Sequence, residues 1–266
     1  MAITRLDTSD LDRLSELQPP NWRDIRPSFE KYLASPHCHP FKFSTGKTII
    51  GVGASILFGN TGWMAHIIVR KRDRRKGVGS ALVSHLVSAL RQRKCQTISL
   101  VASEEGRHLY QRHGFENQMT YVVFARGAVA RNCDLPNHVR QARPMDLGAM
   151  RSLDQETSGE NRSRLFPDLL CDTWLFENAD GIVGFFAPYI GEGVVLARTT
   201  DAGLALLEVK KRYGSLGALP IVNDEGRQWY EENGYVRLRV AHRMHLGPSF
   251  SWRPEQIFAR VGGHVG

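Results

Sequence analysis

Apolar stretches separated by turn-forming residues recur through the first third of the chain. Residues 41–44, 48–58 and 63–69 have the composition of β-strands, and the last of them ends in the apolar run Ile67-Ile68-Val69. Thr45-Gly46 and Asn60-Thr61-Gly62 are turns between these strands. Two later apolar stretches, 97–101 and 121–125, have the length of single strands. The pattern therefore predicts a β-sheet.

Helical spacing marks the segments between these strands. Leu82, Leu86, Val87 and Leu90 fall on one face of a predicted helix over 80–90. Further helices are predicted at three places: 11–17 with Thr8 or Ser9 as its cap, 27–34, and 104–113 closed by Gly114. Strands and helices thus alternate along the first half.

The second half repeats landmarks of the first. Asp10-Leu11 returns as Asp146-Leu147. The run 104–115, with Tyr110 four residues before its glycine, returns as 224–235 with Tyr230. The second copy is shorter between these landmarks, and its predicted strand 194–197 enters its helix 202–209 directly, with Thr200 or Asp201 as the cap. We therefore predict an internal duplication.

Composition excludes a disordered chain and places the charge unevenly. Apolar residues make up 42% of the 266 residues, enough for packed cores. Residues 1–133 carry 20 Lys and Arg against 10 Asp and Glu, whereas residues 134–266 carry 15 against 17. An anionic partner is therefore expected on the first half.

Cysteines and hydropathy point to the cytoplasm. Cys38, Cys95, Cys133 and Cys171 form no C-x-x-C pair, so we expect four free thiols and no metal. The longest apolar stretch, 49–59, is too short to cross a bilayer, and the N-terminal segment does not resemble a secretory signal. We expect a soluble, cytoplasmic protein without a membrane partner.

One loop carries a chemical signal. Arg74-x-x-Gly77-x-Gly79 stands between the predicted strand 63–69 and the predicted helix 80–90. Glycines let main chain approach a ligand, and the N–H groups of a helix's first turn have no internal acceptor, which suits a pyrophosphate. The basic run 70–76 is also compatible with a solvated loop or a nucleic-acid patch.

These motifs resemble the GCN5-related N-acetyltransferases (GNAT). The segment 74–79 resembles the family's R/Q-x-x-G-x-G/A loop for the acyl-CoA pyrophosphate, and Leu109-Tyr110-x-x-x-Gly114-Phe115 resembles its L-Y-x-x-x-G-F segment near the thioester. The resemblance covers residues 4–128. The second half more loosely resembles the degenerate acetyltransferase-like domain found fused behind such enzymes.

The resemblance implies an acetyl-CoA site and no metal. Main chain of the third strand would hold the pantetheine arm, and the N–H of Ile68 or a neighbour would polarise the thioester carbonyl. The implied cofactor-binding residues are Ile67, Ile68, Val69, Arg74, Arg75, Lys76, Gly77, Val78, Gly79 and Ser80.

The resemblance also suggests residues for the chemistry. Tyr110 matches the family's general acid, which protonates the departing thiolate, although a tyrosine there can also simply pack. Many relatives place a glutamate base about four residues before the end of the third strand. Here Ala65 stands at that position and His66 follows it, so His66 is a candidate base, although a histidine in a strand can also be structural; Glu104, Glu105 and an ordered water are alternatives. Trp22 lies in the variable acceptor region and is a candidate substrate-binding residue or a packing aromatic.

We therefore predict an α+β protein with two tandem acetyltransferase-like domains, each a mixed, mostly antiparallel sheet flanked by helices. The predicted limits are 1–128 for the acetyl-CoA domain, 129–139 for a linker, 140–248 for the degenerate domain and 249–266 for a tail. The expected activity is acetyl transfer from acetyl-CoA to a primary amine of a small molecule or peptide. The alternative is a non-catalytic module that senses CoA or binds nucleic acid.

The second domain has no cofactor loop, so we expect it to complete the acceptor pocket or to replace a homodimer mate. We expect one acetyl-CoA per chain and no nucleic-acid partner, and a homodimer stays open.

Overall fold

The computed structural model describes residues 1–266 apart from 21, 23, 128–134, 164–169 and 171. The described residues form two compact units by their internal contacts. The first unit contains residues 1–116, 244–248 and 265, and the second contains residues 117–243, 249–264 and 266. Both combine strands with helices, which confirms the predicted α+β class.

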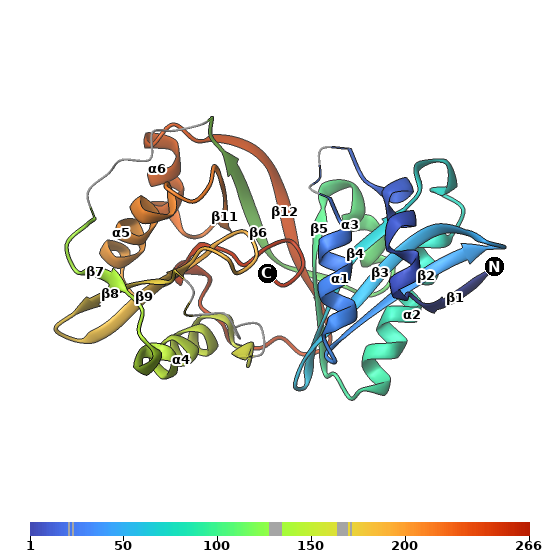
Figure 1. Ribbon diagram of the computed structural model, residues 1–266, viewed down its shortest axis with the longest axis horizontal. Helices are drawn as coiled ribbons and strands as arrows, with labels where there is room; N and C mark the ends of the chain where they lie inside the picture. The colour runs from blue at the N-terminus through green and yellow to red at the C-terminus, as the bar shows by residue number, and fades with distance from the viewer. Residues whose placement is uncertain (21, 23, 128–134, 164–169, 171) are drawn as a thin grey trace. The chain divides into compact units, whose positions relative to one another are not determined.

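The described strands form two sheets (Figure 1). The larger has the order β1-β2-β3-β4-β5-β12-β6-β11, and the smaller has the order β13-β10-β9-β8-β7. The strands are β1 (Ala2–Arg5), β2 (Cys38–Thr45), β3 (Thr48–Phe58), β4 (Thr61–Val69), β5 (Thr97–Ser103), β6 (Glu116–Ala125), β7 (Val139–Gln141), β8 (Trp174–Asn178), β9 (Gly181–Ala187), β10 (Val194–Ala197), β11 (Leu216–Pro220), β12 (Val236–Leu246) and β13 (Ile257–Ala259).

Helices connect and cover these strands. The α-helices are α1 (Arg26–Ala34), α2 (Val78–Gln92), α3 (Glu104–Gln111), α4 (Leu147–Ser158), α5 (Thr200–Lys210) and α6 (Asp224–Glu232). The 3-10 helices are η1 (Thr8–Leu17), η2 (Lys71–Asp73), η3 (Pro144–Asp146) and η5 (Pro254–Gln256). Over the described part of the chain, none of them has the length and apolarity needed to cross a membrane.

Helix α2 packs closely on one face of the first unit's sheet because β3 carries glycines beneath it. A Cβ at Gly51 would lie 3.0 Å from a methyl of Leu82, and one at Gly53 would lie 2.9 Å from a methyl of Leu86. Any larger residue would push the helix away. The close approach fixes the height of α2, and with it the position of the loop that enters the helix.

The opposite face of the same sheet is covered as well. Val52 and Ala54 alternate with those glycines along β3 and are completely buried. Leu14 of η1 and Phe29 of α1 are also fully buried, and η1 contacts β3. The sheet of the first unit is therefore sandwiched between α2 on one face and the η1–α1 segment on the other.

The order of the larger sheet departs from the sequence repeat. β5 is followed by β12, the last strand of the second repeat, whereas β6, which continues the first repeat, lies beside β11. β6 and β11 run antiparallel, with Ala125 opposite Leu216. The two repeats have thus exchanged their last strands. The compact units consequently group residues differently from the domain limits 1–128 and 140–248, which stay a prediction about the repeat.

Two segments that the predicted repeat pairs contain matching hydrogen bonds. The main-chain N–H of Phe115 donates to the oxygen of Tyr110 at 3.1 Å, and that of Tyr235 donates to the oxygen of Tyr230 at 3.0 Å. These bonds close α3 and α6 in the same way. These residues are the ones that correspond when the sequence 104–115 is compared with 224–235.

Asp10 and Asp146 are a second matching pair. Both carboxylates are buried, and each accepts the main-chain N–H of the residue three positions earlier. The distances are 3.1 Å from Asp7 to Asp10 and 2.7 Å from Arg143 to Asp146. Each pair therefore fixes the start of a 3-10 helix in its own repeat.

The N-terminal segment differs from the prediction in two respects. The predicted cap at Thr8 or Ser9 is wrong, because the Asp7 carboxylate accepts the Ser9 N–H at 2.9 Å and so precedes the helix. The strand β1 was also missed. It has only four residues, too few for an alternation to stand out, and pairing with β2 places Ile3 opposite Phe43.

Two of the cysteines are described. Cys38 and Cys95 are buried and free, as the sequence predicts, and burial raises the pKa of both thiols. Neutral buried thiols are poor nucleophiles. Cys133 and Cys171 lie outside the described residues.

Replacing Asp10 tests the buried carboxylate. It accepts the Asp7 N–H and pairs with Lys42 of β2. We expect Asp10→Ala to lower the free energy of unfolding by about 2 kcal/mol, because it removes a capping hydrogen bond and leaves the Lys42 ammonium only the exposed Asp7 carboxylate as its partner. Asp12→Ala, an exposed neighbour, is the control and should change it by less than about 0.5 kcal/mol. Equal losses in urea denaturation of the two variants would contradict the assignment.

Candidate functional site

The connection from β4 to α2 leaves the start of the helix open. Gly77 precedes α2 with a φ of +82° and offers no side-chain cap. The first bond of the helix runs from the Ala81 N–H to the Gly77 oxygen at 3.0 Å. The N–H groups of Val78, Gly79 and Ser80 therefore have no acceptor within the helix. Such a helix start attracts anions.

Asp73 organises the basic side chains of this loop. Its carboxylate accepts a 2.6 Å hydrogen bond from Arg70 and lies 3.4 Å from the Lys76 ammonium. The Arg70 bond holds the pKa of Asp73 below its ordinary value. Arg74 donates to the main-chain oxygen at the end of β4 at 3.2 Å. Arg75 is exposed and has no ion pair among the described residues, so its charge is available to a ligand.

Helix α3 packs against the first turn of α2. A Cβ at Gly79 would lie 3.3 Å from the Leu109 side chain, and the Ser80 hydroxyl lies 2.8 Å from Nε2 of His113. Burial, and to a smaller extent Arg112, lowers the pKa of His113. The predicted residue Ser80 thus has a partner that no sequence motif indicated. This contact holds the helix start beside the segment that carries Tyr110.

The strands β4 and β5 separate as they approach the loop. They pair in parallel from Thr61 opposite Thr97 to Trp63 opposite Ser99, and no described pair continues beyond. The end of β4 therefore has a main-chain edge without a strand partner on that side. We call residues 67–69 the β4 edge. Ile67 and Val69 pack toward α2.

A bulge directs His66 out of the strand alternation. Ala65 lies opposite Ala54 and Ile68 opposite Val52, so two residues of β4 face a single residue of β3. His66 occupies this bulge with a φ of +49°, a conformation that costs a residue with a side chain about 1 kcal/mol. Bulges of this kind commonly re-aim a side chain beside a functional site.

The His66 ring lies within a group of aromatic side chains. Its ring centre is 5.6 Å from that of Tyr32, 5.7 Å from Phe29 and 6.2 Å from Trp22, all in edge contact. Phe29 and Tyr32 are buried, whereas Trp22 is 50% exposed. The structure therefore brings together two of the predicted residues, His66 and Trp22. It adds Tyr32 and Phe29, whose spacing on α1 marks a helix face but no chemistry.

Tyr32 fixes the orientation of the imidazole. Its hydroxyl lies 2.8 Å from Nδ1 of His66, and burial raises the pKa of Tyr32 well above its ordinary value. A tyrosine that keeps its proton can donate to Nδ1 or accept from it. When Nδ1 carries the hydrogen and Tyr32 accepts, Nε2 presents a lone pair. That arrangement suits a base.

Tyr110 lies on the other side of the sheet. It packs with Leu86, Leu100 and Phe115 in the cluster beneath α2 and α3. Burial raises its pKa to about 12, so the phenol keeps its proton at neutral pH. Among the described residues its hydroxyl has no hydrogen-bond partner. Tyr110 therefore packs on the α2–α3 face of the sheet, whereas the His66 ring contacts the aromatic residues of α1.

Glu104 and Glu105 do not join this arrangement. Both are exposed in the first turn of α3, where carboxylates favour the helix dipole, and Glu104 pairs with Arg107 at 3.1 Å. Their contacts are those of first-turn helix residues.

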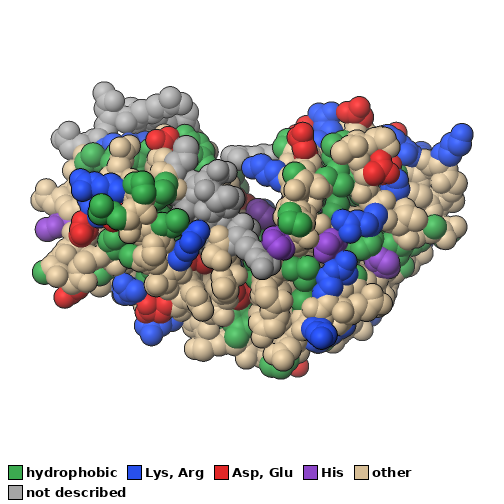
Figure 2. All heavy atoms as spheres, turned by 60° about the horizontal axis from the view of Figure 1, so that its bottom comes forward, with side chains coloured by type: hydrophobic (Ala, Val, Ile, Leu, Met, Phe, Trp, Pro, Cys, Tyr) green, Lys and Arg blue, Asp and Glu red, His purple; other side chains and the backbone are tan. Residues whose placement is uncertain are grey.

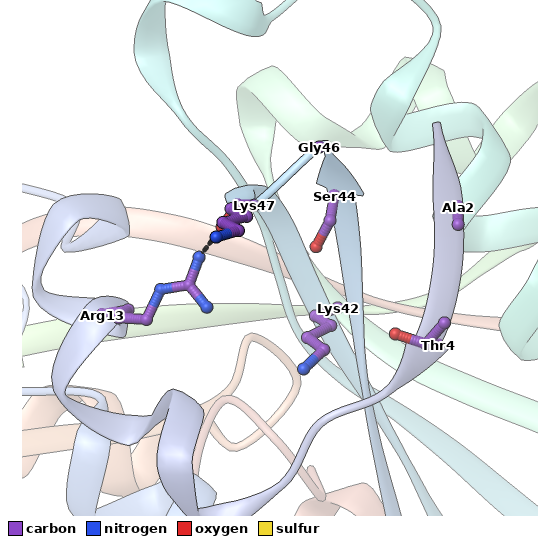
Figure 3. A pocket seen from close by; sticks show the side chains of 7 residues that line it. All are labelled: Ala2, Thr4, Arg13, Lys42, Ser44, Gly46 and Lys47. Carbon is purple, nitrogen blue, oxygen red and sulfur yellow. Dashed lines mark hydrogen bonds between the residues drawn. The ribbon is translucent and has the colours of Figure 1, made fainter.

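A separate hollow of about 570 Å³ lies under η1 (Figure 3). Arg13, Lys42, Lys47, Thr4 and Ser44 line it together with small residues of β1 and the β2–β3 turn. Two of its three cations are already engaged: Lys42 pairs with buried Asp10, and Arg13 donates to the main chain of Lys47. Neither β4, β5 nor α2 contributes to its walls, so it is distinct from the site at the loop.

Other types of site lack support in the described part of the chain. No cluster of three or more His, Cys, Asp or Glu residues there could hold a metal ion. On the face drawn in Figure 2, the Lys and Arg side chains are scattered among other types rather than gathered in one basic strip. Nucleic-acid binding would favour such a strip.

The second repeat differs from the first in the connection between its strand and the helix that follows. Its strand β10 reaches α5 through Arg198 and Thr199 alone. The predicted cap at Thr200 or Asp201 is wrong by one position: Thr199 precedes α5, and its hydroxyl accepts the N–H of the third residue on at 3.4 Å. This helix start is therefore capped, whereas that of α2 is open.

Comparison with known proteins agrees with this geometry. Residues 6–115 match the profile of the acetyltransferase (GNAT) family. A search of curated proteins found no match. A candidate acetyltransferase from Pyrococcus horikoshii superposes with a TM-score of 0.84 at 19% identity, covering 100% of this chain and 95% of that one. A GCN5-related N-acetyltransferase from Sphaerobacter thermophilus gives 0.65 at 16% identity, covering 94% and 98%.

Residues 6–115 thus match the GNAT acetyltransferase family, which confirms the resemblance predicted from the loop and the Tyr110 segment. At these identities the solved structures show the shared fold, and they do so over both units. Family members transfer acetyl groups from acetyl-CoA.

The raised pKa of Tyr110 makes a prediction about alkaline stability. The value is about 12 in the folded chain, against ~10 for an unfolded tyrosine. The folded state holds the proton more tightly, so this stability is complete below about pH 10 and is lost as the pH rises toward 12. The melting temperature of Tyr110→Phe should therefore fall less steeply above pH 10 than that of the wild type. Tyr189→Phe, which alters an exposed ring, should follow the wild type; parallel curves for Tyr110→Phe and wild type would contradict the assignment.

Proposed function

We propose that the first unit transfers the acetyl group of acetyl-CoA directly to a primary amine. The observation that carries the proposal is the end of pairing between β4 and β5 together with the uncapped start of α2, the next helix along the chain. The family match to residues 6–115 supports acetyl-CoA as the donor. The acceptor is a small molecule or a peptide.

The cofactor would be held mainly through main chain. The N–H groups of Val78, Gly79 and Ser80 would bind the pyrophosphate, and the exposed Arg75 would add its charge. The pantetheine amides would pair with the β4 edge as an added strand does, because that edge has no partner there. Main-chain recognition explains why glycines, rather than particular side chains, mark this site in the sequence.

The reaction needs a neutral amine, a polarised carbonyl and a stabilised thiolate. The amine nitrogen attacks the thioester carbon, an N–C bond forms, and the C–S bond breaks. A main-chain N–H of the β4 edge would donate to the carbonyl oxygen as it gains charge. The amine loses a proton and the sulfur gains one, so the reaction needs no oxidant and no metal.

Tyr110 would act on the sulfur as a hydrogen-bond donor. Its pKa of about 12 lies above the ~8.5 of a thiol, so complete transfer of its proton would be uphill by roughly 5 kcal/mol. A hydrogen bond to the developing thiolate avoids that cost. The proton that finally reaches the sulfur would come from the amine or from solvent.

His66 would accept the proton of the attacking amine. Its Nδ1 lies 2.8 Å from the Tyr32 hydroxyl, so Nε2 is the nitrogen that would take the proton when Nδ1 carries the hydrogen. The neighbouring Trp22 is half exposed and would contact the acceptor. The aromatic surroundings favour an acceptor with apolar groups beside its amine.

The direct experiment mixes the full chain with acetyl-CoA and a panel of primary amines and follows release of free CoA thiol. Amine-dependent thiol release is expected. Binding of acetyl-CoA without release across the panel would favour the alternative of a CoA-sensing module. Salt-sensitive binding to arbitrary DNA that acetyl-CoA does not displace would favour a nucleic-acid module.

Gly77→Val tests the cofactor loop. A β-branched residue at φ +82° is strained by about 1–2 kcal/mol. The loop should therefore shift, and its N–H groups would no longer be oriented to bind the pyrophosphate. We expect the affinity for acetyl-CoA to fall at least ~10-fold, a loss of about 1.4 kcal/mol. Gly59→Val is the matched control, since Gly59 has a φ of +66° in open space at the β3–β4 turn. Calorimetry should find that only Gly77→Val weakens binding; unchanged affinity in folded Gly77→Val would remove the central role of the loop.

Tyr110→Phe and His66→Asn test the two ends of the transfer. Each should lower kcat by ~10²-fold, with the acetyl-CoA affinity nearly unchanged. Asparagine at 66 tolerates the positive φ of the bulge. In a plot of log kcat/KM against pH, the slope on the acidic side should decrease by one unit in His66→Asn, because one protonation step is lost. The slope should not change in Tyr110→Phe. An unaltered slope in His66→Asn would exclude His66 as the base.

A further inference from the structure

The second repeat contains the same strand end as the cofactor site. The N–H of Arg198, just after β10, donates to the oxygen of Val183 at 2.8 Å. The N–H of Arg70, just after β4, donates to the oxygen of Ile50 at 2.9 Å. These matching bonds align the last residues of the two strands. Val195 and the residue after it therefore correspond to the first two positions of the β4 edge.

In the second unit this edge already has a partner. The C-terminal strand β13 runs antiparallel to β10, with Ala259 opposite Val195 and Ile257 opposite Leu196. The chain thus pairs its own tail with the positions that correspond to the open edge of β4. In the first unit the same positions would serve the pantetheine arm.

The tail also bonds to the strand on the other side of the gap. The N–H of Arg260 donates to the oxygen of Ala218 in β11 at 2.7 Å. The amide of Asn223, the cap of α6, donates to the oxygens of Glu255 at 2.9 Å and Ile257 at 3.1 Å. Since β11 corresponds to β5, β13 lies in the gap between the two strands of the second unit.

Tyr230, the counterpart of Tyr110, is directed at the tail. Its hydroxyl donates to the main-chain oxygen of Phe258 at 3.4 Å, and both side chains are buried. The Phe258 ring lies against α5, where a Cβ on Gly203 would be only 2.3 Å away. Glycine is a poor helix former, so its presence inside α5 is explained by the space that this ring needs.

The remaining hollow at the start of α5 does not suit a phosphate. It has a volume of about 370 Å³, and Glu225, Glu255 and Arg198 are among the residues that line it. Arg198 already forms an ion pair with Glu156 at 2.9 Å. Thr199 has used one of the helix-start N–H groups as a cap. The corresponding place in the first unit is open and basic.

We propose that the second unit retains a cofactor-type cleft that no longer binds a cofactor, and that residues 254–261 of the same chain occupy it. The tail takes the place of the pantetheine arm and excludes acetyl-CoA. This proposal rests on the proposed function for the identity of the cleft. The second unit therefore fills its own cleft, and we expect its free energy of unfolding to depend on the contacts of residues 254–261.

Hydrogen exchange of the full chain, read by mass spectrometry with and without saturating acetyl-CoA, tests this. Peptides within 254–261 should exchange slowly in both conditions, because their N–H groups lie in a filled cleft. Acetyl-CoA should slow peptides within 66–80 and leave those within 194–203 unchanged. Rapid exchange of 254–261 without the cofactor, or slowing of 194–203 by acetyl-CoA, would overturn the proposal.

A pair of helix variants sharpens the test. Gly203→Ala improves helix propensity but collides with Phe258, so exchange within 254–261 should accelerate at least ~10-fold. Gly148→Ala makes the same change inside α4 in open space and should leave that exchange unaltered. Equal exchange in both variants would overturn the proposal. If acetyl-CoA affects no peptide while the two variants differ as expected, the proposed function fails and the filled cleft stands.

Discussion

The separation of β4 from β5 is the constraint on which the site depends. Parallel pairing stops at Trp63 and Ser99, and among the described residues the end of β4 has no strand partner on that side. An unpaired edge inside a sheet is costly unless something binds it. The uncapped helix α2 begins after this strand end, with His66 at the bulge of β4 and Tyr110 in the cluster beneath α2 and α3. The proposed cofactor binding, proton acceptance and thiolate stabilisation all depend on this one interruption in the sheet.

The two repeats show two ways to satisfy that edge. In the second, β13 supplies the missing hydrogen bonds and Phe258 fills the space beside α5. In the first, the loop 70–77 is longer, its helix start is open, and the edge is left for a ligand. The same frame is therefore compatible with a filled, stable unit and with a binding site. The difference lies in a few residues at one strand-to-helix connection and in the tail.

Sequence patterns predicted most of the features that depend on residues close together in the chain. The glycine loop, the amphipathic face of α2 and the Tyr110 segment each depend on residues close in sequence, and each is found where expected. The bulge at His66 could not be predicted, because it depends on register against β3, and its partner Tyr32 comes from a helix 34 residues earlier. The exchange of β6 and β12 and the insertion of β13 also depend on contacts between distant segments. The spacing of apolar residues along the chain does not indicate which distant segments pair.

A crystal structure of the chain with CoA would test the central claim most directly. One molecule per chain should lie with its pyrophosphate at the N–H groups of Val78 to Ser80 and its sulfur near the Tyr110 hydroxyl, between β4 and β5. CoA bound in the hollow under η1, at α5, or with its sulfur far from both Tyr110 and the β4 edge would contradict the account.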